Sequence, residues 1–358
     1  MKHKCLKFIS VLLLVLIYSI YHYKVNYSNN NNVTQRDISL INERNIVLAV
    51  VACGDRLYET LNMIKSAIMF SESKIMFVIL TEDDLIESFA EKLSQWQEMT
   101  LKKFTFKIMP LKFPVGDTKE WRILFKPCAS QRLFFPSVLG EIDSLIYVDS
   151  DTLFLSPIET LWDHFTHMNS TQMAALVPES EVANIGWYNR FARHPFYGPM
   201  GVNSGVMLMN LTKMREFHWV EYVIPIYKKY KLQLTFGDQD IINIIFHFHP
   251  DKLYLNPCRY NFRTDHCMYM NNCKNVEKEG IVVLHGSRGV FHSGKQPAFQ
   301  AVYRAFEEFQ LNGDLTRDFY QPLETYVDLT SNTPCGTIKD AYLIHIKNYI
   351  DKNDKAIE

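Results

Sequence analysis

The chain has 358 residues, of which 47% are hydrophobic and 13% aromatic, and its formal net charge is −1 at pH 7. This composition supports one large folded domain or two modest ones, and it excludes a disordered or low-complexity protein. A net charge so close to zero gives no electrostatic basis for binding nucleic acid.

The N-terminus carries a short basic segment followed by an apolar one. Residues 1–7 include three lysines, and an apolar run covers residues 8–23. No cleavage site of small residues follows, so we predict an uncleaved signal anchor, with a cleaved signal peptide as the alternative. The positive flank places residues 1–7 in the cytosol. The sequence therefore predicts a single-pass type II protein of the Golgi or endoplasmic reticulum membrane; the short run fits thinner early secretory membranes.

Two further features agree with a lumenal location. Acceptor sequences for N-glycosylation begin at Asn26, Asn32, Asn169 and Asn210. An oxidising lumen also permits disulfides, and the cysteines that cluster in the C-terminal third are the best candidates: Cys258, Cys267, Cys273 and Cys335. Their connectivity stays open. A zinc site is a weaker alternative, because the spacing lacks a paired Cys-x-x-Cys.

Beyond a polar stem at residues 24–44, strands and helices are expected to alternate. Continuous apolar runs predict strands buried on both faces, at residues 45–53, 75–80 and 144–148, and a further strand is expected at residues 104–109. Apolar residues at helical spacing predict helices at 56–69 and 84–96, and a further helix is expected at 128–135, ending at Pro136. This order predicts one α/β domain with a mainly parallel sheet over residues 45–330, followed by a C-terminal extension at 331–358.

Two aspartates stand where the strand at 144–148 ends. Asp149 and Asp151 flank Ser150, and this spacing directs both carboxylates to one side of a regular strand. Ligands of α/β folds bind at the carboxyl ends of strands. Two carboxylates suit Mg²⁺ or Mn²⁺, which also bind phosphate oxygens. The alternative is a turn or cap role. The apolar residues on both sides of the two aspartates favour the metal site over the turn or cap role, because buried carboxylates must be paired, hydrated or metal-bound.

The segment from Leu145 to Phe154 resembles the metal motif of glycosyltransferase family 8, retaining enzymes that include glycogenin and bacterial galactosyltransferases. Further segments resemble family segments in the same order, at residues 130–133, 203–206, 237–240 and 283–286. The resemblance spans roughly residues 45–310. It implies a GT-A-type nucleotide-sugar-binding domain, with helices flanking a mainly parallel sheet.

The resemblance also implies a donor site built around UDP. Asp149, Asp151 and His285 would hold Mn²⁺ (or Mg²⁺) between the two phosphates. Arg132, together with either Arg288 or Lys295, would neutralise the diphosphate. The distance in sequence from His285 to Lys295 is longer than the corresponding distance in the family. The choice between Arg288 and Lys295 therefore stays open, and His292 is a further candidate. The nucleotide would also contact the residues that follow the first strand and the serine of the metal motif: Ala52, Cys53, Arg56 and Ser150.

Other residues are assigned to the sugars. Gln239 would lie at the sugar face away from the leaving group. A carboxamide is a poor nucleophile, so we expect Gln239 to position the donor and stabilise positive charge while UDP itself helps deprotonate the acceptor. Asp238 would bind sugar hydroxyls, or cap the helix that follows. The acceptor or sugar site would include Asn203, Ser204, Gly205 and Trp187. Trp187 belongs to the aromatic-rich stretch 184–199, which suits sugar or protein recognition but equally core packing.

Residues 121–129 and 285–292 resemble, within this family, the animal glucoside xylosyltransferases. That resemblance implies transfer of xylose from UDP-xylose, in an α-1,3 linkage, to glucose O-linked on epidermal-growth-factor-like repeats of Notch-type receptors. The alternatives are a family 8 transferase with another UDP-sugar or acceptor, a non-catalytic lumenal sugar-binding protein, and a metal-dependent phosphohydrolase. The last of these would need more carboxylates at the site, and a base positioned to activate water, and the motifs show neither.

Overall fold

The computed structural model describes residues 45–101, 103–114, 118–122, 124 and 128–357. The predicted cytosolic tail, membrane anchor and stem therefore lie outside the described residues, as do Asn26 and Asn32. Within the described residues, no helix combines the length and the apolar character needed to cross a bilayer. The described residues from Ile46 onward form one compact unit.

The first half of the unit alternates strands with helices, as predicted. Its elements are β1 (Ile46–Ala52), α2 (Leu57–Phe70), β2 (Ile75–Thr81), α3 (Asp83–Met99), β3 (Phe104–Pro110), α4 (Thr118–Arg122), η1 (Ala129–Phe134), α5 (Phe135–Val138), β4 (Ser144–Val148), β5 (Thr152–Phe154), α6 (Glu159–Trp162), η2 (Asp163–His167), β6 (Ala174–Pro178) and α7 (Tyr188–Phe191). The helical segment predicted at 128–135 is confirmed, but its predicted end at Pro136 was wrong. A 3₁₀ turn covers most of it, and Pro136 lies inside the first turn of α5, where proline is well tolerated.

The second half is mainly helical. Its elements are β7 (Val202–Asn210), α8 (Leu211–Glu216), α9 (Trp219–Tyr230), α10 (Asp238–Phe248), η3 (Pro250–Lys252), β8 (Leu253–Leu255), η4 (Cys258–Asn261), η5 (Thr264–His266), α11 (Val276–Glu279), β9 (Val283–His285), η6 (Ser287–Gly289), α12 (Pro297–Glu308), the π-helical η7 (Leu315–Tyr320), α13 (Gln321–Asp328), η8 (Gly336–Ile338) and α14 (Lys339–Ile357). The segment after residue 330 packs into the same hydrophobic core as the rest, through Tyr342 and Ile346.

The strands form a seven-stranded sheet in the order β3-β2-β1-β4-β7-β6-β8. The pairings of β1 with β2 and β4, and of β2 with β3, are parallel, whereas β7 runs antiparallel to β4 and β6. The mainly parallel α/β fold predicted from the sequence is therefore confirmed. A second, two-stranded sheet pairs β5 with β9, and this small sheet shapes the candidate site described below.

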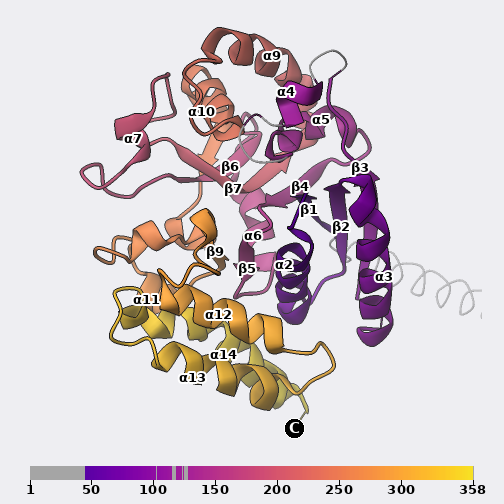
Figure 1. Ribbon diagram of the computed structural model, residues 1–358, viewed down its shortest axis with the longest axis vertical. Helices are drawn as coiled ribbons and strands as arrows, with labels where there is room; N and C mark the ends of the chain where they lie inside the picture. Colours follow the sequence, from indigo (N-terminus) through magenta and orange to yellow (C-terminus); the bar gives the residue numbers. More distant parts are fainter. Residues whose placement is uncertain (1–44, 102, 115–117, 123, 125–127, 358) are drawn as a thin grey trace, which may run out of the picture. The chain divides into compact units, whose positions relative to one another are not determined.

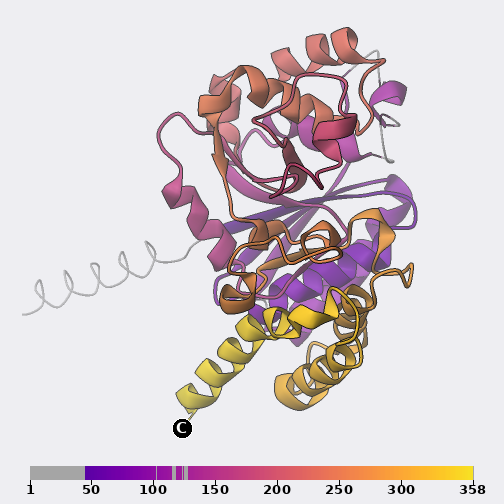
Figure 2. The same ribbon diagram turned by 90° about the vertical axis from the view of Figure 1, so that its left-hand side faces the viewer.

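Two hydrophobic cores lie on opposite faces of the large sheet. Alternate residues of β1 belong to different cores: Ile46 and Leu48 to one, Val47 and Ala49 to the other, as the two-residue period of a strand requires. Helices α2, α3 and α12–α14 cover the first face, and α5 and α8–α10 cover the second (Figure 1). Figure 2, turned by 90°, shows the C-terminal helices again grouped below the sheet.

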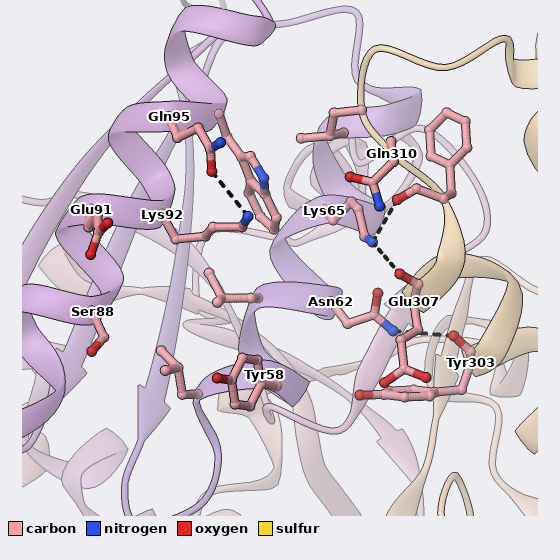
Figure 3. Close-up of a pocket in the computed structure, with 15 residues that line it drawn as sticks. Tyr58, Asn62, Lys65, Ser88, Glu91, Lys92, Gln95, Tyr303, Glu307 and Gln310 are labelled. Atoms are coloured by element: carbon pink, nitrogen blue, oxygen red, sulfur yellow. Dashed lines mark hydrogen bonds between the residues drawn. The ribbon is translucent and has the colours of Figure 1, made fainter.

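A groove of about 560 Å³ runs between α2, α3 and α12 on the outer surface of the first layer. Figure 3 shows Lys65 reaching from α2 to the end of α12. Its amino group donates to the carbonyl of Glu307 at 3.2 Å and to that of Phe309 at 2.9 Å. These carbonyls have no partner within the helix, so a cation there stabilises the helix end. Burial lowers the pKa of Lys65 to about 8.

Three disulfides stabilise the unit: Cys53–Cys128, Cys258–Cys273 and Cys267–Cys335. The prediction that the four C-terminal cysteines pair among themselves is confirmed, and the zinc alternative is excluded for them. The bridge between Cys53 and Cys128 was not foreseen. It ties the carboxyl end of β1 to the residue that precedes η1, and so fixes the start of the segment that carries Arg132.

We expect removal of the Cys267–Cys335 bridge to destabilise the unit. The two cysteines are 68 residues apart in sequence, and a disulfide of this kind contributes about 2–4 kcal/mol by restricting the unfolded chain. The double variant Cys267→Ala/Cys335→Ala should therefore unfold at lower urea concentration under non-reducing conditions. With dithiothreitol the wild type loses the same bridge, so the two midpoints should converge; equal midpoints without reductant would contradict the prediction.

Candidate active site

The two aspartates of the predicted metal motif lie between β4 and β5, and His285 is the last residue of β9. Antiparallel pairing of β5 with β9 places Thr152 opposite His285, which carries the imidazole to the aspartate turn. Its Nε2 lies 3.2 Å from Asp151 Oδ1 and 3.7 Å from Asp149 Oδ2. One ligand atom from each of the three residues lies within 4.8 Å of the others. The three side chains form a candidate site for one divalent metal ion.

The hydrogen bonds of His285 fit such an ion. Its Nδ1 lies 2.8 Å from Asn261 Oδ1; because a carbonyl oxygen only accepts, Nδ1 carries the proton. In a neutral imidazole, Nε2 then directs a lone pair toward the two carboxylates, an arrangement that a cation between them would stabilise. Metal-bound histidines commonly donate their other nitrogen to an oxygen in this way. Two carboxylates and one imidazole can accept Mn²⁺ or Mg²⁺.

Gly205 explains why the imidazole can occupy this position. The residue lies in β7, and its carbonyl accepts the Asp149 amide at 2.8 Å. A Cβ atom added to Gly205 would lie 2.2 Å from Cε1 of His285. The ring therefore fills the space that any side chain at this position would need. This is a steric requirement for glycine in the Asn-x-Gly segment.

Arg132 connects the metal cluster to α10. Its Nη1 donates to Asp149 Oδ1 at 2.9 Å and to the Ser204 carbonyl at 2.7 Å, and its Nε forms an ion pair with Asp238. The guanidinium also lies 4.5 Å from the centre of the Tyr147 ring, whose hydroxyl donates to the same Asp149 oxygen. Arg132 was expected to face the diphosphate. Its buried charge orients Asp149 and Asp238, the first residue of α10, and its contact with a diphosphate stays a prediction.

Asp238 does not cap α10, contrary to one of the two roles considered for it. The cap residue is Gly237, whose combination of φ 60° and ψ −115° is readily accessible only to glycine. Burial raises the pKa of the Asp238 carboxyl, and the neighbouring Arg132 charge opposes that shift.

Gln239 belongs to a continuous chain of side-chain hydrogen bonds. Its Oε1 accepts from Asn203 Nδ2 and from the Ser204 amide, each at 3.2 Å, and its Nε2 donates to Glu179 at 3.3 Å. Asn203 in turn accepts from Asn261 at 2.8 Å, and Asn261 holds His285. The metal cluster and Gln239 are thus parts of one network, which fixes their orientation relative to each other.

Several residues of this site were not identified from the sequence. Glu179 follows β6, an apolar strand that ends in a carboxylate, so the rule that selected Asp149 could have selected it as well. Burial raises the pKa of Glu179, and the charge of Arg263 opposes that shift. Asn261, Arg263 and Asp265 lie in or beside short 3₁₀ turns. These turns carry no comparable signal in the sequence.

A cavity of about 540 Å³ opens over the metal cluster, a size suited to a small-molecule ligand. Most of the predicted site residues line it: Cys53, Arg56, Arg132, Asp149, Ser150, Asp151, Trp187, Asn203, Ser204, Asp238, Gln239, His285 and Arg288. Three predicted residues are not among those that line it. Ala52 and Gly205 are buried behind its wall, and Lys295 is exposed. Cys53 contributes to the wall as half of a disulfide.

An aromatic wall, formed by Trp187 and Phe236, bounds one side of the cavity. Their rings are 4.7 Å apart in an edge-to-face arrangement. Arg288 lies 6.0 Å from the Trp187 ring and donates to Asp265 at 2.7 Å. Arg288 therefore closes the edge of the cavity between Trp187 and Asp265. The predicted aromatic stretch thus contributes at least Trp187 to the cavity.

Asp240, the last residue of the Asp-Gln-Asp segment, anchors this aromatic stretch. Its Oδ1 accepts from the Tyr188 hydroxyl at 2.7 Å and lies 3.1 Å from His194 Nε2. Burial alone would lower the pKa of His194, but the hydrogen bond and charge of Asp240 raise it. The three buried side chains attach the stretch to α10, next to Gln239.

The two predicted glycosylation sites within the described residues, Asn169 and Asn210, differ in their structural environment. Asn169 is exposed, and its Oδ1 accepts from the Thr171 amide at 2.9 Å. Asn210 caps α8 by accepting from the Lys213 amide at 2.8 Å.

Comparisons with known proteins agree with this fold and site. The family model described as Glycosyl transferase family 8 matches residues 20–285, and the chain belongs to this family of glycosyltransferases. It is 51% identical over 313 residues to mouse glucoside xylosyltransferase 2, covering 84% of this chain and 70% of the relative. Human glucoside xylosyltransferase 1 is 50% identical over 311 residues, again covering 84% and 70%.

Solved structures share the fold at much lower identity. The galactosyltransferase LgtC, solved with donor and acceptor sugar analogues, matches with a TM-score of 0.52 and 18% identity, covering 67% of this chain and 86% of that one. The glycosyltransferase GlyE of Streptococcus pneumoniae matches with a TM-score of 0.53 and 16% identity, covering 81% and 65%. These matches confirm a GT-A-like α/β fold for the catalytic unit.

Proposed function

We propose that this glycosyltransferase moves xylose from UDP-xylose to glucose O-linked on epidermal-growth-factor-like repeats, such as those of Notch-type receptors. The observation that carries the proposal is the network that joins Asp149, Asp151 and His285 to Gln239 across one cavity. About half of the residues are identical to those of glucoside xylosyltransferases over most of the chain, which supports xylose as the sugar and a glucoside as the acceptor. An α-1,3 linkage with retained configuration rests on the same resemblance.

In this proposal, Asp149, Asp151 and His285 hold Mn²⁺ (or Mg²⁺). The ion, when bound, would neutralise charge on the departing diphosphate. Arg132 keeps Asp149 turned toward the cluster and holds Asp238 at the cavity wall, where its carboxylate is available to the sugar hydroxyls. Trp187, Asn203 and Ser204 line the part of the cavity next to Gln239. They form the proposed sugar and acceptor side.

Gln239 is the proposed positioning group at the reacting sugar. Its carbonyl oxygen already accepts hydrogen bonds from Asn203 and Ser204. Donors on a carboxamide oxygen reduce its nucleophilicity, which supports a front-face transfer in which the departing diphosphate helps to deprotonate the acceptor hydroxyl. The amide dipole would then stabilise positive charge that develops on the sugar.

We further propose that the catalytic unit is lumenal and attached by a type II anchor at residues 8–23, in the Golgi or endoplasmic reticulum. The three disulfides of the described residues support an oxidising compartment. Glycans at the predicted asparagines, detected as a mobility shift on treatment with an N-glycosidase, would test the lumenal orientation.

A donor panel tests the proposed activity. Protein spanning residues 45–358 would be incubated with UDP-xylose, UDP-glucose, UDP-galactose or UDP-glucuronic acid, an O-glucosylated repeat, and Mn²⁺ or EDTA. Transfer from UDP-xylose that requires the ion is the expected result. Faster transfer from another UDP-sugar would favour a different family 8 activity. No turnover of any of them would favour a non-catalytic sugar-binding protein.

Replacement of Gln239 by alanine should lower kcat about 10²-fold, the effect of losing one group that stabilises the transition state. Affinity for UDP should stay within about twofold, because Gln239 lies on the sugar side of the network. Gln233→Ala, which changes an exposed glutamine of the preceding turn, provides a matched control. Near-normal kcat in Gln239→Ala would contradict the role.

A further inference from the structure

Glu59 is a buried carboxylate in the first turn of α2, behind the cavity wall beside the metal cluster. Its side chain is 5% exposed, which is unusual for glutamate. Transfer of a carboxylate out of water is costly unless cations or hydrogen-bond donors surround it. The groups that contact the Glu59 carboxylate therefore indicate the role of this buried charge.

Those partners come from three separate segments near the cavity. Arg56 Nη1 donates to one carboxylate oxygen of Glu59 at 2.5 Å, and the Ser150 hydroxyl donates to the same oxygen at 3.4 Å. The other oxygen lies 3.1 Å from His292 Nε2. Glu59 thus joins the start of α2 to the turn between the two metal-site aspartates and to the segment after β9.

Arg56 is the partner that reaches the cavity. Its side chain is 39% exposed, and Arg56 belongs to the cavity wall. Burial alone would lower the pKa of Arg56, but Glu59, Asp55 and Asp151 raise it, which places its charge within electrostatic range of the metal loop. Arg132, the other arginine that lines the cavity beside the metal cluster, is instead held by Asp149, Asp238 and the Ser204 carbonyl. Arg56 is therefore better placed to meet an anionic ligand.

We propose that Glu59 is a positioning residue of the donor site: it holds the Arg56 guanidinium beside the metal loop, where Arg56 binds the diphosphate of the nucleotide sugar. This inference rests on the proposed use of a UDP-sugar. It assigns to Arg56 the contact for which Arg288, Lys295 and His292 were the candidates. His292 lies 3.1 Å from the other oxygen of Glu59 and is not among the residues that line the cavity. Of the remaining two, Arg288 is held by Asp265, and Lys295 is exposed and is not among the residues that line the cavity.

A purely structural role for Glu59 makes a different prediction. In that case Glu59 would only tie α2 to the segment after β9, through His292, whose ring packs against Tyr303 at 4.8 Å. Loss of His292 would then weaken the site as much as loss of Glu59. Binding of uridine, which has no diphosphate, would suffer as much as binding of UDP.

Calorimetric titration of the full chain with UDP and with uridine, in excess Mn²⁺, separates these roles. Arg56→Met should weaken UDP binding about 10–100-fold, the range expected for a lost charge-assisted contact. Glu59→Gln should weaken it about tenfold, because the guanidinium loses the carboxylate that orients it. Both variants should bind uridine within about twofold of the wild type, and His292→Phe should retain UDP affinity within about threefold.

The double variant Glu59→Gln/Arg56→Met should bind UDP no more weakly than Arg56→Met alone, because residues that act as a unit are non-additive. Additive losses would overturn the inference, as would unchanged UDP affinity in Arg56→Met or equal losses for UDP and uridine. A wild type that binds uridine and UDP equally would overturn it while leaving a sugar-binding protein possible. A wild type that binds neither ligand would overturn the proposed function as well.

Discussion

Replacement of Asp151 by asparagine should abolish Mn²⁺-dependent binding of UDP and lower kcat/KM for transfer by about 10³-fold or more. The expected size follows from the several kcal/mol that a divalent ion contributes to a departing diphosphate, at one factor of ten per 1.36 kcal/mol. The Asp151→Asn substitution keeps the size of the side chain but removes the charge that faces His285 Nε2 at 3.2 Å. Thermal unfolding with and without Mn²⁺ and UDP, together with initial transfer rates, provides the measurement.

The same substitution should not destabilise the protein without metal. Asp149 and Asp151 offer oxygens within 4.8 Å of each other, and like charges at such distances repel. We therefore expect the metal-free midpoint of Asp151→Asn to equal or exceed that of the wild type. Asp143→Asn, next to the opposite end of β4, serves as the control and should keep the Mn²⁺-dependent shift. A variant at Asp151 that still gains stability from Mn²⁺ and UDP would contradict the metal assignment.

The sequence could predict the part of this site that is formed by residues adjacent in the chain. An apolar run that ends in Asp149-Ser150-Asp151 shows both the buried strand and the polar groups at its end. Position at the carboxyl end of a parallel strand then places the ligand. The β1, β2 and β3 strands were identified because each is a short run dominated by apolar residues.

The rest depends on pairings between distant segments. His285 reaches the aspartates through β5 and β9, strands of only three residues, and residue composition alone does not reveal that such short segments pair. Asn261 reaches His285 through an isolated bridge of Phe262 with Leu284. The same limit explains Arg132. Its basic character was visible, but not that Asp149 and Asp238 would converge on it from two other elements.

The disulfides are a second example of pairings between distant residues that the sequence alone does not reveal. A cluster of cysteines along the chain indicated which four residues pair, yet spacing alone does not distinguish among the possible connections. Cys53 and Cys128 stood apart from that cluster and were not expected to pair. Their bridge follows from the packing of η1 against the end of β1, which only the folded chain brings together.

Replacement of Gly205 by alanine should inactivate the site nearly as completely as replacement of His285 itself. Gly205 does not have a positive φ, so alanine is compatible with its backbone and the effect is steric. The added methyl group would lie 2.2 Å from His285 Cε1, which forces the imidazole away from Asp149 and Asp151. We expect loss of Mn²⁺-dependent UDP binding and a fall in kcat/KM within about tenfold of that in His285→Ala. Overpacking should also lower stability by about 1–3 kcal/mol.

Two comparisons separate displacement of the ring from general misfolding. Gly140→Ala, where an added Cβ would meet nothing within 4 Å, should leave activity and stability unchanged, and Gly205→Ala should still bind uridine. In the double variant Gly205→Ala/His285→Ala, the ring that clashes is absent, so the stability lost in Gly205→Ala should be largely recovered while Mn²⁺-dependent binding stays lost. Normal Mn²⁺-dependent UDP affinity in Gly205→Ala would contradict this placement of His285. Recovery of stability without recovery of metal binding would show that Gly205 acts through the position of the imidazole.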